Sequence, residues 1–268
     1  MARLQSISIY PVKAARGEDL SFAHLSDRGL VGDREWMLTR PDGTFLSQRT
    51  HPQLARLVAT RREGGLSLAY GVQAPLTVNA FEGGSLRDLR VWDDRMQGWD
   101  AGDAAADWLA TALGVPARLA RVTPATRRMA DRHYVGEQDV PVAFSDGYPI
   151  LVCTMASLAE LNRRLPAPVP MDRFRPNLVL DGLDAFEEDR IRAVRIGSVV
   201  LHLVKPCTRC SVPTIDQLTG TPSTDPIPAL KAFRFDRELG GVTFGVNAYA
   251  DAPPGAELSV GEAVEILA

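Results

Sequence analysis

Cysteine and histidine are both scarce in this chain of 268 residues. The three cysteines are Cys153, Cys207 and Cys210. An odd and small number of thiols predicts no disulfide framework and fits a reducing compartment, so we expect a cytoplasmic protein. The four histidines lie far apart in the sequence, at His24, His51, His133 and His202. Because a structural zinc ion needs four ligands, this supply argues against a zinc site.

Long apolar runs and an excess of charge are also missing. No stretch of about 18 apolar residues occurs, so we expect no membrane-spanning helix and no membrane partner. The N-terminal segment lacks the long apolar core of a signal peptide. With 30 basic and 33 acidic residues the formal net charge is −3, which excludes nucleic acid or an anionic membrane as the main partner. The hydrophobic share of 45% is ordinary for a soluble globular protein with one large or two modest cores.

What is present is a succession of short, half-apolar segments separated by glycine and proline. We expect strands at 4–10, 36–38, 45–49, 54–60, 66–70, 76–78, 86–91, 143–147, 178–180, 193–196, 199–204, 242–249 and 263–267. Two helices interrupt them, one from Asp103, which can cap it, to Leu113, and one capped by Thr154 or Ser157 and ending near Arg164. This pattern predicts a mainly β (α+β) fold with two β-barrel-like subdomains and a few short helices.

The segment from Leu119 to Val140 has no clear periodicity, so we expect a long connecting loop. We place the domain boundary here, which predicts one domain at residues 1–120 and another at residues 121–268. Arginines gather in this segment and beside it, at Arg118, Arg121, Arg127, Arg128 and Arg132. They form either a solvated face or a docking strip for an acidic redox partner or a phosphate.

The most informative stretch is Leu201–Gly220, LHLVKPCTRCSVPTIDQLTG. Its apolar start predicts a strand that ends at Pro206, because proline has no backbone N–H to donate. Cys207 and Cys210 follow at CxxC spacing, with Arg209 between them. A thiol at the end of a rigid strand and beside a cation is well placed to be a thiolate. A thiolate can act as a soft ligand for a transition metal or as a sulfur nucleophile.

This stretch has other interpretations. CxxC can be half of a zinc site, although the rest of the chain offers few further ligands. It can be a dithiol redox motif, but such motifs open a helix, and Pro213 argues against a long one. It can also be two half-buried cysteines in a turn, since free cysteine is often a small apolar residue. The residues alone leave these alternatives open.

Five segments in order carry a family resemblance: YPVKAARG, FLSQRTHPQLARL, AFSDGYPIL, DRFRPNLVL and VKPCTRCSVPTIDQLTG. Together they resemble the MOSC family, and specifically its subgroup with an N-terminal MOSC β-barrel domain. The resemblance runs from Leu4 to about Leu267. It implies a MOSC N-terminal domain at residues 1–120, a MOSC domain at residues 121–268, and a molybdenum cofactor with its metal on molybdopterin.

The resemblance also implies roles for single residues. Cys210 would bind the metal and take part in catalysis, and Asp146 would hold a water molecule or relay a proton beside it. The residues that would bind the pterin are Lys13, Arg49, Ser145, Arg175, Asn177, Thr208 and Arg209. Ordinary alternatives exist for these side chains, such as exposed strand-end charges, turn residues, or an ion pair of Arg175 with Asp172 or Asp181.

The implied activity is the molybdenum-dependent reduction of N-hydroxylated compounds, namely amidoximes, hydroxylamines and N-hydroxylated bases, by two-electron cleavage of the N–O bond. Because no cysteine follows Cys210, we expect the electrons to come from a separate flavin or iron–sulfur reductase. Two alternatives remain: a sulfur carrier of the sulfurase type, in which the cysteine transfers sulfur, and a cofactor-binding carrier without turnover.

Overall fold

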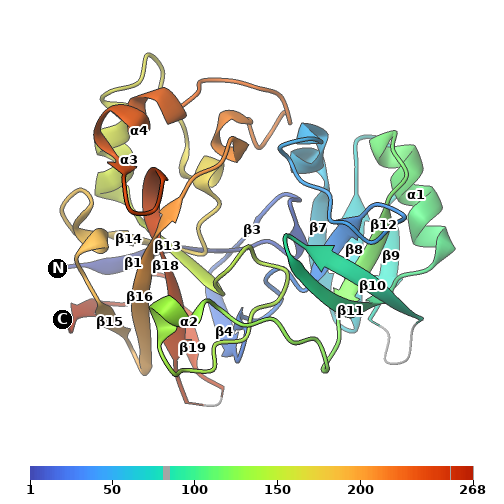
Figure 1. The fold of residues 1–268 in the computed structure, drawn as a ribbon, viewed down its shortest axis with the longest axis horizontal. Coiled ribbons are helices and arrows are strands. Elements are labelled where there is room, and N and C mark those ends of the chain that lie inside the picture. The colour runs from blue at the N-terminus through green and yellow to red at the C-terminus, as the bar shows by residue number, and fades with distance from the viewer. Residues whose placement is uncertain (81–84, 254, 268) are drawn as a thin grey trace.

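Strands make up most of the regular structure, as Figure 1 shows, and the predicted mainly β fold is confirmed. The computed structural model describes residues 1–80, 85–253 and 255–267. None of the described helices has the length and apolar character that crossing a membrane requires. The α-helices are α1 (Asp103–Leu113), α2 (Arg132–Val135), α3 (Met155–Asn162) and α4 (Ile227–Phe233), and the 3-10 helices are η1 (Pro52–Arg56), η2 (Met171–Phe174), η3 (Glu187–Asp189) and η4 (Val212–Thr214).

One large sheet contains strands from both ends of the chain. Its hydrogen-bonded order is β20 (Val264–Ile266), β15 (Ala193–Ile196), β16 (Val199–Thr208), β18 (Gly241–Asp251), β13 (Ile150–Thr154), β14 (Leu178–Asp181), β1 (Arg3–Ile9) and β3 (Glu18–Leu20), with β17 (Phe235–Asp236) pairing with β18. Strands β1 and β3, from the first 20 residues, therefore belong to a sheet that the second half of the chain mostly builds. The division between residues 120 and 121 stays a prediction.

Three smaller sheets complete the fold. The five-stranded sheet has the order β10 (Leu86–Val91), β11 (Asp94–Asp100), β12 (Arg118–Val122), β6 (Trp36–Thr39) and β2 (Val12–Lys13). The two three-stranded sheets are β19 (Glu257–Ser259), β4 (Phe22–Ser26) and β5 (Gly29–Leu30), and β7 (Val58–Arg62), β8 (Gly65–Ala69) and β9 (Leu76–Asn79). In Figure 1, strands β7 to β12 and α1 form one lobe, and the large sheet with α3 and α4 forms the other.

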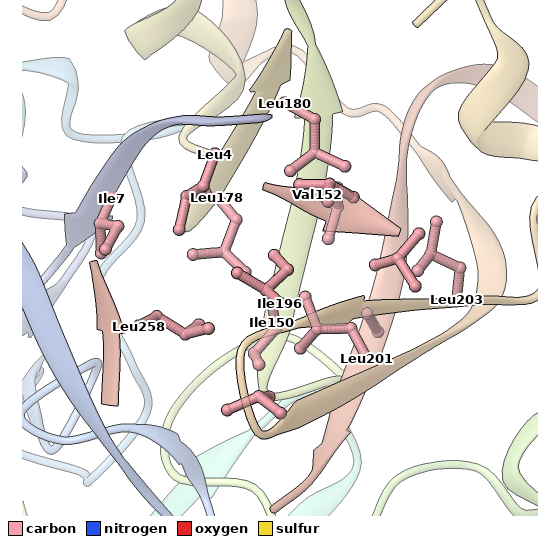
Figure 2. Close-up of a cluster of buried hydrophobic side chains, with 14 of the residues drawn as sticks. Leu4, Ile7, Ile150, Val152, Leu178, Leu180, Ile196, Leu201, Leu203 and Leu258 are labelled. Atoms are coloured by element: carbon pink, nitrogen blue, oxygen red, sulfur yellow. The ribbon is translucent and has the colours of Figure 1, made fainter. Parts of the chain in front are cut away.

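Side chains of β1 enter the core of the large sheet from positions that do not follow a simple alternation. Leu4, Ile7 and Ile9 are all fully buried there, and Figure 2 shows Leu4 and Ile7 beside Leu178 and Leu258. A strict period of two would put Leu4 and Ile7 on opposite faces. The register against β14 shifts between Leu4 and Ser6, because a β-bulge inserts one extra residue there. The bulge therefore turns both side chains into one core.

The expectation that Pro206 ends its strand is wrong. Strand β16 continues through Pro206 to Thr208, and its pairing with β18 shifts register twice, between Leu203 and Lys205 and between Pro206 and Thr208. An irregular ladder accommodates proline, which has no backbone N–H to donate. Cys207 therefore lies within the strand, and Cys210 follows it.

Three other expected strands differ from the structure. The segment 45–49 makes only an isolated bridge between Thr39 and Phe45 before it turns. The segment 54–60 begins in the 3-10 helix η1 and becomes strand only at β7. The segment 143–147 is irregular. The buried guanidinium of Arg128 donates to the carbonyl oxygens of Ala143 and Ser145, each at 2.7 Å, so these oxygens do not pair with a neighbouring strand.

The two predicted helices are present. Helix α1 has the predicted ends, and its residues Ala105, Leu109 and Leu113 are buried, but its N-cap is Gly102 and the Asp103 side chain makes no capping hydrogen bond. Thr154 caps α3 by accepting a hydrogen bond from the backbone N–H of Ser157. The predicted loop from residue 119 to 140 is only partly irregular, because β12 and α2 occupy its two ends.

Candidate functional site

An open cleft lies where loops from both halves of the chain meet. Its empty space, counted out to its mouth, is about 880 Å³. Eight of the nine predicted site residues line it: Lys13, Arg49, Ser145, Asp146, Arg175, Asn177, Arg209 and Cys210. Thr208 does not line it, since this exposed residue is the last of β16 and pairs with Thr243 of β18. Segments that are far apart in the sequence therefore bring the thiols of Cys207 and Cys210, one carboxylate and several cations together.

The thiol end of the cleft is built around Arg209. Its Nη2 donates to the carbonyl oxygen of Phe174 at 2.7 Å, and its Nη1 donates to the Cys207 sulfur at 3.1 Å. Its Nε is buried and has no partner among the described residues. Cys210 is exposed beside it. Two of the five N–H groups of this guanidinium are thus fixed, and its Nε–H is unsatisfied, which suits an acceptor that arrives in the cleft.

A buried lysine and an exposed carboxylate form the opposite wall. Lys13 Nζ donates to Asp146 Oδ1 at 2.6 Å and to the Phe144 carbonyl oxygen at 2.7 Å, and Trp92 Nε1 donates to the same Oδ1 at 3.1 Å. Burial lowers the pKa of Lys13 against the opposing effect of Asp146. The surrounding protein opposes ionisation of Asp146, but Lys13 and Trp92 hold its pKa well below its usual range. The carboxylate is ionised at neutral pH, and its side chain is 72% exposed.

Two arginines enclose an aromatic ring at the floor of the cleft. The guanidinium carbons of Arg34 and Arg175 lie 4.2 and 4.1 Å from the ring centre of Tyr10. The Tyr10 hydroxyl donates to the Pro176 carbonyl oxygen at 3.1 Å, and burial raises its pKa. Burial also lowers the pKa of Arg175 to about 10. Both arginines are cationic at neutral pH, so the floor carries two positive charges.

Asn177 acts as a support for this floor. Its Oδ1 accepts from Arg34 Nη1 at 2.9 Å and from the backbone N–H of Leu151 at 3.1 Å, and its Nδ2 donates to the Ser8 carbonyl oxygen at 3.1 Å. Asp33 accepts two further bonds from Arg34. The amide of Asn177 is therefore largely used within the protein, and it fixes Arg34 more than it offers a contact to a ligand.

Backbone strain is concentrated at this cleft. Among the described residues, five non-glycine residues have positive φ, and four of them line it: Ala14 (68°), Arg34 (48°), Trp92 (56°) and Arg175 (56°). Such conformations are costly for residues with a Cβ and tend to occur at functional sites. Their clustering is an indication of function that is independent of the side-chain chemistry.

Four further lining residues have no role in the sequence analysis: Arg34, Trp92, Gln48 and Tyr148. Gln48 and Tyr148 lie within the segments FLSQRTHPQLARL and AFSDGYPIL, so the family resemblance is a signal that points to them. Arg34 stands two positions before the buried strand β6. Trp92 lies in the turn between β10 and β11, where no local pattern marks it.

The predicted arginine strip is not a free basic surface. Four of its members contact carboxylates: Arg118 with Asp100 and Asp103, Arg121 with Glu35, Arg128 with Asp94, and Arg132 with Asp139. Arg128 is only 4% exposed. These ion pairs join β12 and the segment after it to neighbouring elements, whereas Arg127 and Arg132 remain exposed to solvent.

No group of three or more His, Cys, Asp or Glu side chains in the described ranges could hold a metal ion. A single thiol at Cys210 does not complete a coordination sphere by itself. It does fit a cofactor that brings further metal ligands and carries an anionic group. The unsatisfied Arg209 Nε and the cationic floor are the features that such a group would satisfy.

Comparisons with known proteins agree along the whole chain. The profile of the MOSC N-terminal beta barrel domain matches residues 1–116, and that of the MOSC domain matches residues 139–265. Mitochondrial amidoxime reducing component 2 of Bos taurus is 34% identical over 84% of this chain and 70% of its own length. Mitochondrial amidoxime-reducing component 1 of Homo sapiens is 33% identical over 97% of this chain and 81% of its own length.

Among solved structures, the YuaD protein of Bacillus subtilis covers 98% of this chain and 94% of its own, with a TM-score of 0.44 and 8% identity. A likeness at that level carries no argument. The relatives are named mitochondrial, and the cytoplasmic location expected for this chain stays a prediction. Two profile matches and relatives more than 30% identical over most of the sequence show that this chain belongs to the MOSC family, with an N-terminal MOSC β-barrel domain ahead of its MOSC domain.

Proposed function

We propose that this protein is a molybdenum-cofactor-dependent reductase of N-hydroxylated compounds, of which amidoximes are the leading class. The observation that carries the proposal is the convergence of Cys210 with Arg34, Arg175 and Arg209 in one cleft. A soft thiol suits a thiophilic metal, and planar guanidinium groups suit the phosphate of a pterin. The relatives named amidoxime-reducing components support the choice of substrate.

The residues present divide into a metal end and an anion end. Cys210 would supply the protein ligand to the metal. Arg209 would donate its unsatisfied Nε–H, and the guanidinium groups of Arg34 and Arg175, already oriented by Tyr10, would bind the phosphate. Prior orientation reduces the entropy lost on binding, because these long side chains are already held in place. Arg49 is exposed at the mouth and adds a further cation.

The bound cofactor would supply the two electrons that cleave the N–O bond of the substrate. Two protons are also needed, so that the N–OH group becomes N–H and the oxygen leaves as water. Asp146 is ionised and is therefore an acceptor. Lys13 and Trp92 both bond its Oδ1, so Oδ2 can accept a hydrogen bond from a substrate N–H or from a water molecule. Ser145, which precedes Asp146 in the sequence, is buried and lines the same wall of the cleft.

The electrons would come from a separate flavin or iron–sulfur protein. The described residues contain only one exposed and one half-buried thiol besides the buried Cys153, which offers no cluster site of its own. The cleft is open at its mouth, so a partner or a small substrate can approach it without a large conformational change.

The two neighbouring cysteines provide the decisive experiment. We expect Cys210→Ser to lose bound molybdenum and to lower benzamidoxime reduction, with a reduced dye as electron donor, to background. We expect Cys207→Ser, the matched control, to retain the metal. The measurements are elemental analysis and a reductase assay on the same samples. Full metal content and full activity in Cys210→Ser would contradict the proposal.

A sulfur carrier is the second candidate, and one contact favours it. The guanidinium of Arg209 donates to the Cys207 sulfur at 3.1 Å, an arrangement in which a cation can activate a sulfur nucleophile. Metal-free protein with sulfane sulfur on Cys210 or Cys207, detected by mass spectrometry of the intact chain, would replace the reductase with this function.

A further inference from the structure

Trp92 holds an unusual position at the mouth of the cleft. It follows β10 directly and lies in the turn that leads to β11, so it belongs to the tip of a hairpin from the five-stranded sheet. Its backbone has a φ of 56°, and its side chain remains 42% exposed. A large aromatic residue in a strained and half-exposed turn has little to gain from burial alone.

Two opposite charges meet on its indole ring. The guanidinium carbon of Arg49 lies 4.2 Å from the ring centre, and the indole Nε1 donates to Asp146 Oδ1 at 3.1 Å. The ring of Phe45 packs against the indole edge to face, with ring centres 5.0 Å apart. The ring is therefore held by three contacts, and it gives each of the two charges a different kind of partner.

The two charged groups do not neutralise each other. Within the described part of the chain, no ion pair joins Arg49 to Asp146, although both contact the same ring. An exposed arginine and an exposed carboxylate at such close quarters would otherwise attract each other. The indole face attracts the cation, and the indole N–H together with Lys13 Nζ holds the anion, so neither charge needs the other as a partner.

We propose that Trp92 is a positioning residue that keeps Arg49 and Asp146 apart, so that each remains available to a different ligand group in the cleft. Arg49 stays free for an anionic group, and Asp146 stays free to accept through Oδ2. We rest the roles of Arg49 and Asp146 on the proposed function, whereas the way in which Trp92 holds them follows from the contacts alone.

Two substitutions separate the two halves of this role. Trp92→Phe keeps an aromatic face and loses the N–H, and Trp92→Leu loses both. The probe is inorganic pyrophosphate, titrated by calorimetry into the full chain. We expect Trp92→Phe to bind it within about twofold of the parent chain, and Trp92→Leu to bind it about two- to fivefold more weakly, because Arg49 then pairs with Asp146.

A double-mutant cycle tests the cause of that loss. In an Asp146→Asn background Arg49 has no carboxylate to pair with, so adding Trp92→Leu should no longer weaken pyrophosphate binding. The second readout is the pKa of Asp146 by carboxyl carbon NMR, which should rise in Trp92→Phe because one stabilising donor is lost.

The matched control is Trp108→Phe. It also removes an indole hydrogen bond, to the Ala74 carbonyl oxygen, but lies on α1 away from the cleft. It should change neither pyrophosphate binding nor the pKa of Asp146. Pyrophosphate affinity of Trp92→Leu equal to that of the parent chain, or an unchanged pKa of Asp146 in Trp92→Phe, would overturn the role of Trp92. If Trp92→Leu fails to fold, Trp92→Phe still decides the matter through the pKa. Neither readout needs turnover, so a chain without molybdenum would end the proposed function and leave this test intact.

Discussion

Gln48 and Gln217 exchange hydrogen bonds through their side-chain amides, at 3.0 and 2.9 Å, across 169 positions of the sequence. Both side chains are buried. Gln48 Nε2 also donates to the Ala14 carbonyl oxygen, and Gln217 Oε1 also accepts from Arg175 Nη1 at 3.2 Å. This pair therefore joins three segments that line the cleft, and it fixes one of the two arginines in its floor.

Gln217→Leu should destabilise the fold, because it leaves the amide of Gln48 partly unsatisfied and removes an acceptor from Arg175. We expect a cost of about 1–3 kcal/mol in the free energy of unfolding. The double variant Gln48→Leu with Gln217→Leu should cost less than the sum of the single changes, since no amide is then left without its partner. Urea denaturation of the three variants measures this. Additive costs would show that the two amides act independently.

Arg127 and Arg128 are adjacent but differ in role. Arg128→Ala removes the donors to the Ala143 and Ser145 carbonyl oxygens and the contact with Asp94. We expect a loss of about 2–4 kcal/mol of stability, because several buried partners lose their bonds together. Arg127→Ala, at an exposed position, should stay within about 0.5 kcal/mol of the parent chain. Thermal unfolding of the two variants measures both costs. Equal losses of stability would refute the structural role of Arg128.

Asp146→Asn should leave the buried Lys13 without a carboxylate partner, because the amide oxygen and the Phe144 carbonyl oxygen accept hydrogen bonds but carry no charge. The pKa of Lys13 should fall further, which nitrogen NMR of the lysine side chain can measure. Asp146 has a depressed pKa in the folded chain, so its stabilising effect is present above pH about 4 and is lost as the pH falls toward the folded value. The stability gap between parent and variant should shrink in acid.

The exposed pair of Arg132 and Asp139 offers a control for this experiment. Asp139→Asn makes the same chemical change in a pair that solvent screens, and it should alter stability by less than about 0.5 kcal/mol. A stability gap for Asp146→Asn that stayed constant from neutral pH into acid would contradict the ion pair with Lys13.

Arg175→Lys keeps the charge but loses the planar group that stacks on Tyr10 and reaches Gln217. A lysine cannot present two parallel donors to a phosphate, so pyrophosphate binding should weaken by about tenfold. Arg3→Lys, in an exposed pair with Asp181, serves as the control and should bind like the parent chain. Equal affinities for both variants would exclude Arg175 from the anion end of the cleft.

Glu188 is a buried carboxyl that accepts hydrogen bonds from the hydroxyls of Ser157 and Thr154. Burial raises its pKa in the folded chain. The unfolded chain releases this proton first, near pH 4, so the group lowers stability as the pH rises above that value. Glu188→Gln should lack this pH dependence. The free energy of unfolding of the variant minus that of the parent chain, measured by denaturant titration, should therefore increase between pH 4 and 7. If the free energy of unfolding of both chains changed in parallel with pH, the raised pKa of Glu188 would be refuted.

The sequence predicted a strand or helix correctly where the residues of that segment themselves determine its conformation. The apolar run 178–180 and the apolar face of α1 are examples, and both elements are present. Pro206 shows where local reasoning fails, because two bulges against β18 keep it in a strand. The segment 143–147 fails for the same reason, since Arg128, far from it in the sequence, binds its carbonyl oxygens.

The candidate site shows the same division. Lys13, Arg175 and Cys210 lie in segments with a recognisable family pattern, and the fold brings them to one cleft. The roles of Arg34 and Trp92 depend on partners that are distant in the sequence. Arg34 stacks on Tyr10, and Trp92 donates to Asp146. No local pattern of charge or periodicity records such partners, so only the structure could reveal them.

The position of β1 in the large sheet has a consequence for synthesis on the ribosome. Arg3 pairs with Asp181, 178 residues later, and the backbone N–H of Leu4 bonds to the carbonyl oxygen of Glu262. At about 5–20 residues per second, β1 waits roughly ten to forty seconds for Asp181 and Glu262 to emerge. During that interval β1 can pair only with the short strand β3, so Leu4, Ile7 and Ile9 lack most of the core that buries them. Nascent chains therefore expose this apolar strand until the second half of the chain has been made.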